Sequence, residues 1–164
     1  MISRKKIIIV VLLLLSCIGC DQATKVIARA SLPFYTTHTF FNDFLRLQYA
    51  ENPGGMMSLG AELPEEVRFW FLTVFVGLML TGILLFALFS RKLSPSQIVG
   101  LTLIVGGGLS NLVDRLRNDG HVIDFVTIGI GTIRTAIFNL ADATILLGTL
   151  ILVLSTTAIR KEEV

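Results

Sequence analysis

Two aspartates lie where a charged side chain is costly. Asp124 lies between large apolar residues in the run Val122-Ile123-Asp124-Phe125, and Asp142 lies near the start of a long apolar segment. Two carboxyl groups that meet in an apolar pocket cannot both ionise at low cost, because desolvation and mutual repulsion raise one pKa. A protonated acid beside a carboxylate can activate water and polarise a carbonyl, which is the chemistry of aspartic proteases. The pattern therefore indicates acid–base catalysis by Asp124 and Asp142.

Nucleophilic and metal-dependent chemistry find little support in the sequence. Ser110 has no paired histidine, and Cys17 and Cys20 both fall in the first apolar segment. His38 and His121 lie in expected loops without partner ligands, which favours surface histidines over a metal site. We expect no metal site.

Other polar residues gather at one end of the apolar segments. Asp21 and Lys25 lie four residues apart, a spacing that favours a stabilising ion pair at a helix end over a chemical role. Arg115 is equally consistent with an anchor at the lipid headgroups and with a place in a site. The whole set that we expect beside the two aspartates is Asp21, Lys25, Asn52, Gly54, Asn111, Arg115 and Asn139.

The composition indicates the elements that must position these residues. The 164-residue chain is 53% hydrophobic and only 16% charged, with a mean hydropathy of +0.77, which is typical of an integral membrane protein. A net charge of +2 gives no basic field for nucleic acid. Crossing a bilayer takes about 20 helical residues. The sequence predicts a single, mainly α domain over residues 1–164, a four-helix bundle with spans at roughly 7–30, 69–89, 98–113 and 137–159.

The short basic segments predict the orientation in the membrane. They comprise Arg4, Lys5 and Lys6, then Arg91 and Lys92, then Arg160 and Lys161. The positive-inside rule makes that side cytoplasmic, so both termini are expected there. Segments 31–67 and 114–136 then lie outside. Alternation in 45–49 predicts a strand that could pair with 128–137, forming a small extracytoplasmic β-element. Residues 62–68 are expected to lead into the second span as a helix.

The first apolar segment has a second interpretation. A basic start, an apolar run and either Cys17 or Cys20 together resemble a cleaved bacterial lipoprotein signal peptide. Asp21 and Lys25 share a helical face just after Cys20, which favours a helix that continues through this point.

Taken together, the motifs resemble those of the signal peptidase II family of bacterial membrane aspartic peptidases. The resemblance covers nearly the whole chain. It rests on five ordered blocks: Asp21-Gln22-Ala23-Thr24-Lys25, Asn52-x-Gly54, Gly106-Gly107-Gly108-x-x-Asn111-x-x-Asp114-Arg115, Val122-x-Asp124-Phe125 and Phe138-Asn139-x-Ala141-Asp142. One departure is Met57, which stands where the family usually has phenylalanine.

The resemblance implies cleavage of a prolipoprotein immediately before a diacylglyceryl-modified cysteine. It assigns the catalytic pair to Asp124 and Asp142, and a structural role to Asp114. It implies that Asn52, Gly54, Asn111, Arg115 and Asn139 contact or orient the substrate and that Asp21 and Lys25 support the site. The implied partners are the prolipoprotein signal peptide and membrane lipid, with no nucleic acid, no metal and no cofactor. The expected form is a monomer in the bacterial cytoplasmic (inner) membrane, with its active site near the extracytoplasmic face.

Two other classes of protein compete with a peptidase. A transporter or ion pathway also carries intramembrane Asp, Asn and Arg, but it needs polar residues through the full membrane depth. The expected second and fourth spans have no charged or amide side chains in their cytoplasmic halves. A scaffold protein would tolerate replacement of Asp124 and Asp142.

Overall fold

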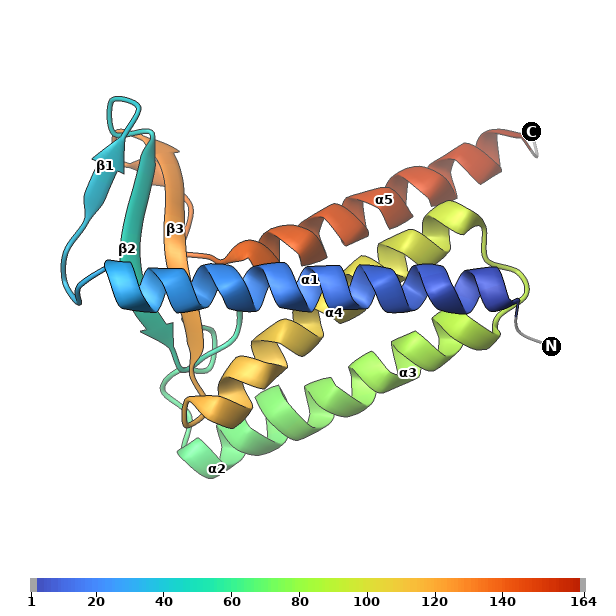
Figure 1. The fold of residues 1–164 in the computed structure, drawn as a ribbon, viewed down its shortest axis with the longest axis horizontal. Coiled ribbons are helices and arrows are strands. Elements are labelled where there is room, and N and C mark those ends of the chain that lie inside the picture. The colour runs from blue at the N-terminus through green and yellow to red at the C-terminus, as the bar shows by residue number, and fades with distance from the viewer. Residues whose placement is uncertain (1–2, 163–164) are drawn as a thin grey trace.

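Long helices form a bundle, and a small sheet lies across one end of it (Figure 1). The computed structural model describes residues 3–162, with side chains described through 156. The helices are α1 (Arg4–Ser31), α4 (Pro95–Arg117), α5 (Leu140–Glu162), and a continuous helical stretch made of α2 (Glu65–Arg68), the π-helical η2 (Phe69–Phe75) and α3 (Val76–Phe89). The expected fold class, a mainly α membrane bundle with a small β-element, is confirmed.

The helices have the length and surface of membrane spans. Arg4–Ser31, Glu65–Phe89 and Pro95–Arg117 are each long and apolar enough to cross a bilayer, and Leu140–Thr156 is a shorter apolar stretch of α5. The side chains on the outside of the bundle are apolar and exposed. Leu15, Leu78 and Leu146, for example, are 64%, 69% and 71% exposed. Such surfaces suit lipid as the surrounding solvent.

Helix α4 packs against α1, α3 and α5, and it lies close to α5. Gly107 makes this approach possible. A Cβ atom there would lie 2.5 Å from the carbonyl oxygen of Ala141 and 2.8 Å from the side chain of Ile145. Small residues at such crossings let helix backbones pack closely in membranes. This contact brings the outer end of α4 against the start of α5.

Helix α4 begins at Pro95, before the predicted start of the third span at 98, and Ser94 is its N-cap. The Ser94 hydroxyl accepts from the backbone N–H of Gln97, and the Gln97 side chain accepts from that of Ser94, which forms a capping box before Pro95. At the same end of the bundle, Lys6 Nζ donates to the carbonyl oxygen of Ser90 at 2.9 Å. The basic start of α1 and the α3–α4 connection therefore lie together.

The sheet is antiparallel in the order β1-β2-β3-β4. Its strands are β1 (His38–Phe40), β2 (Leu45–Asn52), β3 (Val122–Ile130) and β4 (Ile133–Arg134). Leu45 pairs with Ile128 and Asn52 with Val122. The predicted partner strand at 128–137 was therefore misplaced. Pairing starts six residues earlier, and the chain turns back after Ile130 into β4.

The predicted boundaries of the spans also need correction. The fourth helix begins at Leu140 rather than 137, because Phe138 continues the sheet. Its N–H donates to the oxygen of Val126 at 2.8 Å and its oxygen accepts from the N–H of Val126 at 2.9 Å. The second span begins earlier than predicted, at Glu65, and the first at Arg4.

Candidate active site

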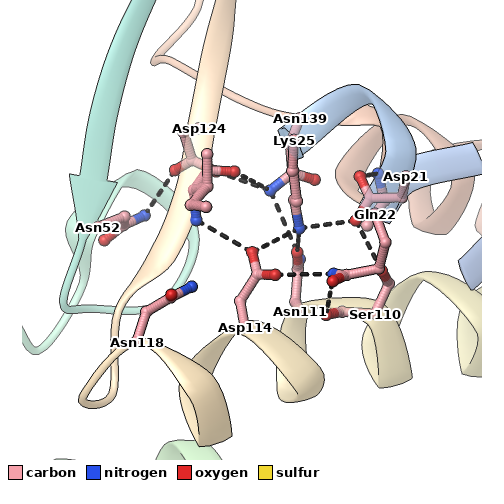
Figure 2. A network of polar contacts seen from close by, with 12 residues as sticks. Asp21, Gln22, Lys25, Asn52, Ser110, Asn111, Asp114, Asn118, Asp124 and Asn139 are labelled. Atoms are coloured by element: carbon pink, nitrogen blue, oxygen red, sulfur yellow. Dashed lines mark hydrogen bonds and ion pairs between the residues drawn. The ribbon is translucent and has the colours of Figure 1, made fainter. Parts of the chain in front are cut away.

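Buried polar side chains meet where the helix ends face the sheet (Figure 2). They come from five segments that lie far apart in the sequence. All nine expected residues contribute to one connected region. The sources are α1 (Asp21, Gln22 and Lys25), the end of β2 with its following turn (Asn52 and Gly54), α4 (Ser110, Asn111, Asp114 and Arg115), β3 (Asp124) and the start of α5 (Asn139 and Asp142).

Asp124 is held by two amides. Asn139 Nδ2 donates to Oδ1 at 2.7 Å and Asn52 Nδ2 donates to Oδ2 at 3.1 Å. The residue is only 3% exposed. Burial, reinforced by the charge of Asp142, raises the pKa of Asp124 to about 6, although the two amide hydrogen bonds oppose this shift. Asp124 therefore combines a well-fixed carboxyl group with a proton affinity far above that of an ordinary aspartate.

Asp142 lies in the first turn of α5. Its Oδ1 accepts from Asn111 Nδ2 at 2.9 Å, and its Oδ2 accepts from the backbone N–H of Asn139 at 3.1 Å. The Asn139 side-chain oxygen in turn accepts from the backbone N–H of Asp142 at 2.9 Å. Asn139 and Asp142 thus cap each other at the start of the helix.

Asn139 connects the two aspartates. It is fully buried, and besides Asp124 its Nδ2 faces Asn111 Oδ1 at 3.1 Å and the oxygen of Ile123 at 3.2 Å. One asparagine side chain therefore touches β3, α4 and its own helix.

Lys25 sets the orientation of Asn111. Its Nζ donates to Asn111 Oδ1 at 2.8 Å. Because an ammonium group can only donate, the oxygen of this amide must face Lys25, and the Nδ2 group is left to face Asp142.

Lys25 is also the centre of a buried ion network. Its Nζ lies 2.7 Å from Asp21 Oδ2 and 2.8 Å from Asp114 Oδ2, and all three side chains are at most 3% exposed. The predicted pairing of Asp21 with Lys25 is present, but it lies inside the bundle rather than at a helix end. Two carboxylates around one ammonium leave a net charge of −1, which hydrogen bonds must help to stabilise.

These carboxylates also join the elements that carry the site. Asp21 accepts from the hydroxyl of Ser110 at 2.7 Å and from the N–H of Ala141, in the first turn of α5, at 2.8 Å. Asp114 accepts from the N–H of Ile123, next to Asp124, at 3.0 Å. The N-terminal segment is therefore part of the bundle that holds the site, in agreement with a helix that continues past Cys20.

Sequence reasoning did not single out Gln22 or Ser110 as site residues. Gln22 Nε2 donates to Asp114 Oδ1 at 2.7 Å and contacts the Ser110 hydroxyl at 3.2 Å. Its position next to Asp21 was the available signal, since a polar side chain in an apolar helix needs buried partners.

The turn after β2 brings Arg115 to the site. Asn52 Oδ1 accepts from the N–H of Gly54 at 2.9 Å, and Arg115 Nη2 donates to the Gly54 oxygen at 2.5 Å. Only glycine fits at position 54, because a Cβ there would lie 2.6 Å from the carbonyl group of Ser58. Arg115 thus contacts the turn that also carries Asn52.

Asp124 opens onto a cavity of about 250 Å³ beneath this turn. Its walls are formed by Ala50, Glu51, Asn52, Met57, Ser58, Asp124, Ala136 and Ile137. Met57 has a positive φ of 57° and is 72% exposed. Among the residues that the structure describes, no three His, Cys, Asp or Glu side chains are grouped to hold a metal ion.

Comparison with known proteins decides the family. The family model for signal peptidase (SPase) II matches residues 12–158. The chain belongs to the signal peptidase II family. It is similar to the lipoprotein signal peptidase of Syntrophus aciditrophicus, with 33% identity over 87% of this chain and 88% of the relative. It is also similar to that of Streptococcus pneumoniae, with 31% identity over 99% and 97% of the two chains.

Solved structures show the same fold. A bacterial membrane enzyme determined at 2.3 Å superposes with a TM-score of 0.81 and 21% identity, covering 94% of this chain and 91% of that one. As a member of its family, the protein is an aspartic endopeptidase of the membrane, and it removes signal peptides from lipoproteins.

Proposed function

We propose that Asp124 and Asp142 form the catalytic pair and that they cleave a prolipoprotein before its diacylglyceryl-modified cysteine, using water as the nucleophile. The observation that carries this proposal is Asn139, whose side chain bonds Asp124 at 2.7 Å while its backbone and side chain cap Asp142. One buried residue thus holds both carboxyl groups at the same site, next to a cavity of about 250 Å³.

The two aspartates take different roles in this mechanism. Asp124 carries the proton, in keeping with its raised pKa of about 6, and donates it to the oxygen of the scissile carbonyl. Asp142 takes a proton from water as the water oxygen bonds to the carbonyl carbon. The tetrahedral intermediate then carries two hydroxyl groups. As the C–N bond breaks, one hydroxyl returns its proton to Asp124 and the C=O bond re-forms, while the proton on Asp142 passes to the leaving amine of the cysteine.

The amide side chains keep the carboxyl groups in place during this sequence. Asn111 orients Asp142, and Asn139 orients Asp124. Lys25, which is paired with Asp21, fixes Asn111 by a hydrogen bond. Arg115 lies against Gly54 at the edge of the turn over Asp124. We assign Arg115, Asn52 and Gly54 to the binding of the substrate backbone near the scissile bond.

The site lies near the extracytoplasmic face of a bacterial inner membrane, with both termini in the cytoplasm. In support, the basic start of α1 and the α3–α4 connection meet at the end of the bundle opposite the sheet (Figure 1). The cut site of a signal peptide helix lies at the outer surface, so the acyl chains of the substrate remain in lipid while its peptide bond reaches Asp124. All assigned side chains come from one chain, and the enzyme acts as a monomer.

The test uses purified protein in lipid with a diacylglyceryl-modified prolipoprotein and its unlipidated form. Wild type is compared with Asp124→Asn and Asp142→Asn. The matched control is Asp43→Asn, which removes a surface aspartate paired with Arg46 and Arg134. We expect only the lipidated form to be cut, and only by wild type and the control. Undiminished cleavage by either folded variant would overturn the assignment of the pair.

A further inference from the structure

A second cavity extends the one at Asp124. It measures about 480 Å³ and is lined by Phe34, Tyr35, Thr36, Thr37, Gln48, Tyr49, Ala50, Glu51 and Ile137. Ala50, Glu51 and Ile137 line both cavities. The two cavities are therefore adjacent, and together they extend from Asp124 along β2 to the segment that follows α1. We call the part lined by Phe34–Thr37 and Gln48–Glu51 the outer groove.

The outer groove lies beyond the membrane-spanning segments. Helix α1 ends at Ser31, just before Phe34, and β2 belongs to the sheet across that end of the bundle (Figure 1). A signal peptide occupies the bilayer, and its lipidated cysteine lies at the surface. Only the residues that follow the cysteine are outside the bilayer, so they are the part of the substrate that can reach this groove.

The walls of the outer groove suit an extended polar peptide. Thr36, Thr37 and Gln48 line it with hydroxyl and amide groups. At one side Phe34 packs edge-on against Tyr49, with ring centroids 4.7 Å apart. Hydroxyl and amide groups beside aromatic rings are the combination that orients a bound ligand by hydrogen bonds and packs against its apolar parts.

Glu51 gives the outer groove its charge. It is the one charged residue among the described residues that line this cavity. Its Oε1 accepts from the hydroxyl of Tyr49 at 2.8 Å. Burial and Glu51 itself raise the pKa of Tyr49 to about 12, so this hydroxyl stays protonated and keeps its hydrogen bond. The nearby Arg29, whose charge lowers the pKa of Tyr49, donates a hydrogen bond to Asn118 Oδ1 at 3.2 Å.

We propose that the outer groove is a specificity subsite that binds the first residues after the modified cysteine, and that Glu51 makes it favour basic over acidic side chains there. The proposal rests on the proposed function, because it needs the scissile bond at Asp124. The charge acts on the transition state as well as on binding, since the peptide stays in the groove until the C–N bond breaks.

Three lipidated substrates test this subsite. They are identical except for Lys, Gln or Glu at the second and third positions after the cysteine. kcat/KM is measured for wild type, for Glu51→Gln and for Glu62→Gln, a matched removal of an exposed acid that does not line either cavity. Wild type and Glu62→Gln should cut the Lys substrate about fivefold faster than the Glu substrate, as a partly exposed ion pair allows. Glu51→Gln should bring the two rates within about twofold.

The Gln substrate separates the possible failures. If wild type cuts none of the three substrates, the proposed function fails. If wild type cuts all three equally, or if Glu51→Gln keeps the full preference, the subsite is wrong while the cleavage itself stands. The readout for Glu51→Gln is the ratio of its rates on the Lys and Glu substrates, with the Gln substrate as the neutral reference. An equal loss of rate on all three substrates, with the preference kept, would mean that Glu51 supports the site and does not select the peptide.

Discussion

Asn139 and Asp142 each accept a hydrogen bond from the other's backbone N–H, at 2.9 Å and 3.1 Å. This reciprocal cap begins α5, and the same Asn139 side chain bonds Asp124 at 2.7 Å. The local rule that satisfies the free N–H groups of a helix start thus also fixes one carboxyl group relative to the other. The hydrogen bonds that begin α5 therefore also set the geometry of the proposed catalytic pair.

Asn139→Ala should therefore damage catalysis more than folding. The substitution removes the amide from Asp124 and the cap from Asp142, so both carboxyl groups can move. A misplacement of about 1 Å costs roughly 100-fold in rate, and loss of a helix cap costs about 1 kcal/mol. We expect kcat to fall about 100-fold while size-exclusion chromatography in detergent still gives a folded monomer. A rate within a few-fold of wild type would show that Asn139 does not position the pair.

The pH dependence of cleavage should reflect Asp124. The mechanism needs a proton on this residue, whose pKa is raised to about 6, so kcat/KM should fall as the pH rises above about 6. The contribution of Asp124 to the stability of the folded protein also falls as the pH rises. Because the pKa in the folded protein exceeds that of an unfolded aspartate, this contribution is fully present below about pH 4 and is lost as the pH rises through about 6.

Asn52→Ala should shift the fall in kcat/KM to higher pH. The hydrogen bond from Asn52 lowers the pKa of Asp124, so its removal lets the residue hold its proton longer. Profiles of kcat/KM measured with one substrate in the same detergent would check this. The equivalent change at Asn42, an exposed residue of the β1–β2 turn, should leave the profile unchanged. A shift to lower pH would contradict the assigned role of Asp124.

Lys25→Met should destabilise the protein strongly. It leaves Asp21 and Asp114 buried and without their ammonium partner, and breaking a buried ion pair from one side costs about 3–5 kcal/mol. Thermal unfolding in detergent should show a lower Tm. The triple variant Lys25→Met, Asp21→Asn and Asp114→Asn should recover part of the loss, because it removes the unpaired charges. Equal Tm values for Lys25→Met and wild type would mean that the network carries little stability.

Gly107→Ala should weaken the contact between α4 and α5. The added Cβ would lie 2.5 Å from the backbone oxygen of Ala141, and overpacking of this kind costs about 1–3 kcal/mol. Since Ala141 precedes Asp142, cleavage should fall as well. Gly19→Ala is the matched control, because nothing lies within 4 Å of its added Cβ. Both variants are compared by Tm and by cleavage of the lipidated substrate, and equal behaviour would contradict the tight crossing.

The sequence alone determined the membrane class and the family, because both depend on local composition and on ordered motifs. Hydropathy located the four spans to within a few residues. It missed the start of the fourth, since apolar residues such as Ile137 and Phe138 suit a helix and a strand equally. Alternation likewise predicted β2 but could not place its partner, because a repeat of two residues carries no information about register.

Only the tertiary structure decided how the polar residues are connected. Lys25 meets Asp114 and Asn111 across 89 and 86 residues of chain, and no local pattern encodes such a contact. The same holds for Gln22, whose partners lie on α4. Burial in a low-dielectric bundle forces each polar group to find a partner, and the packing of α1, α4 and α5 determines which partner it finds.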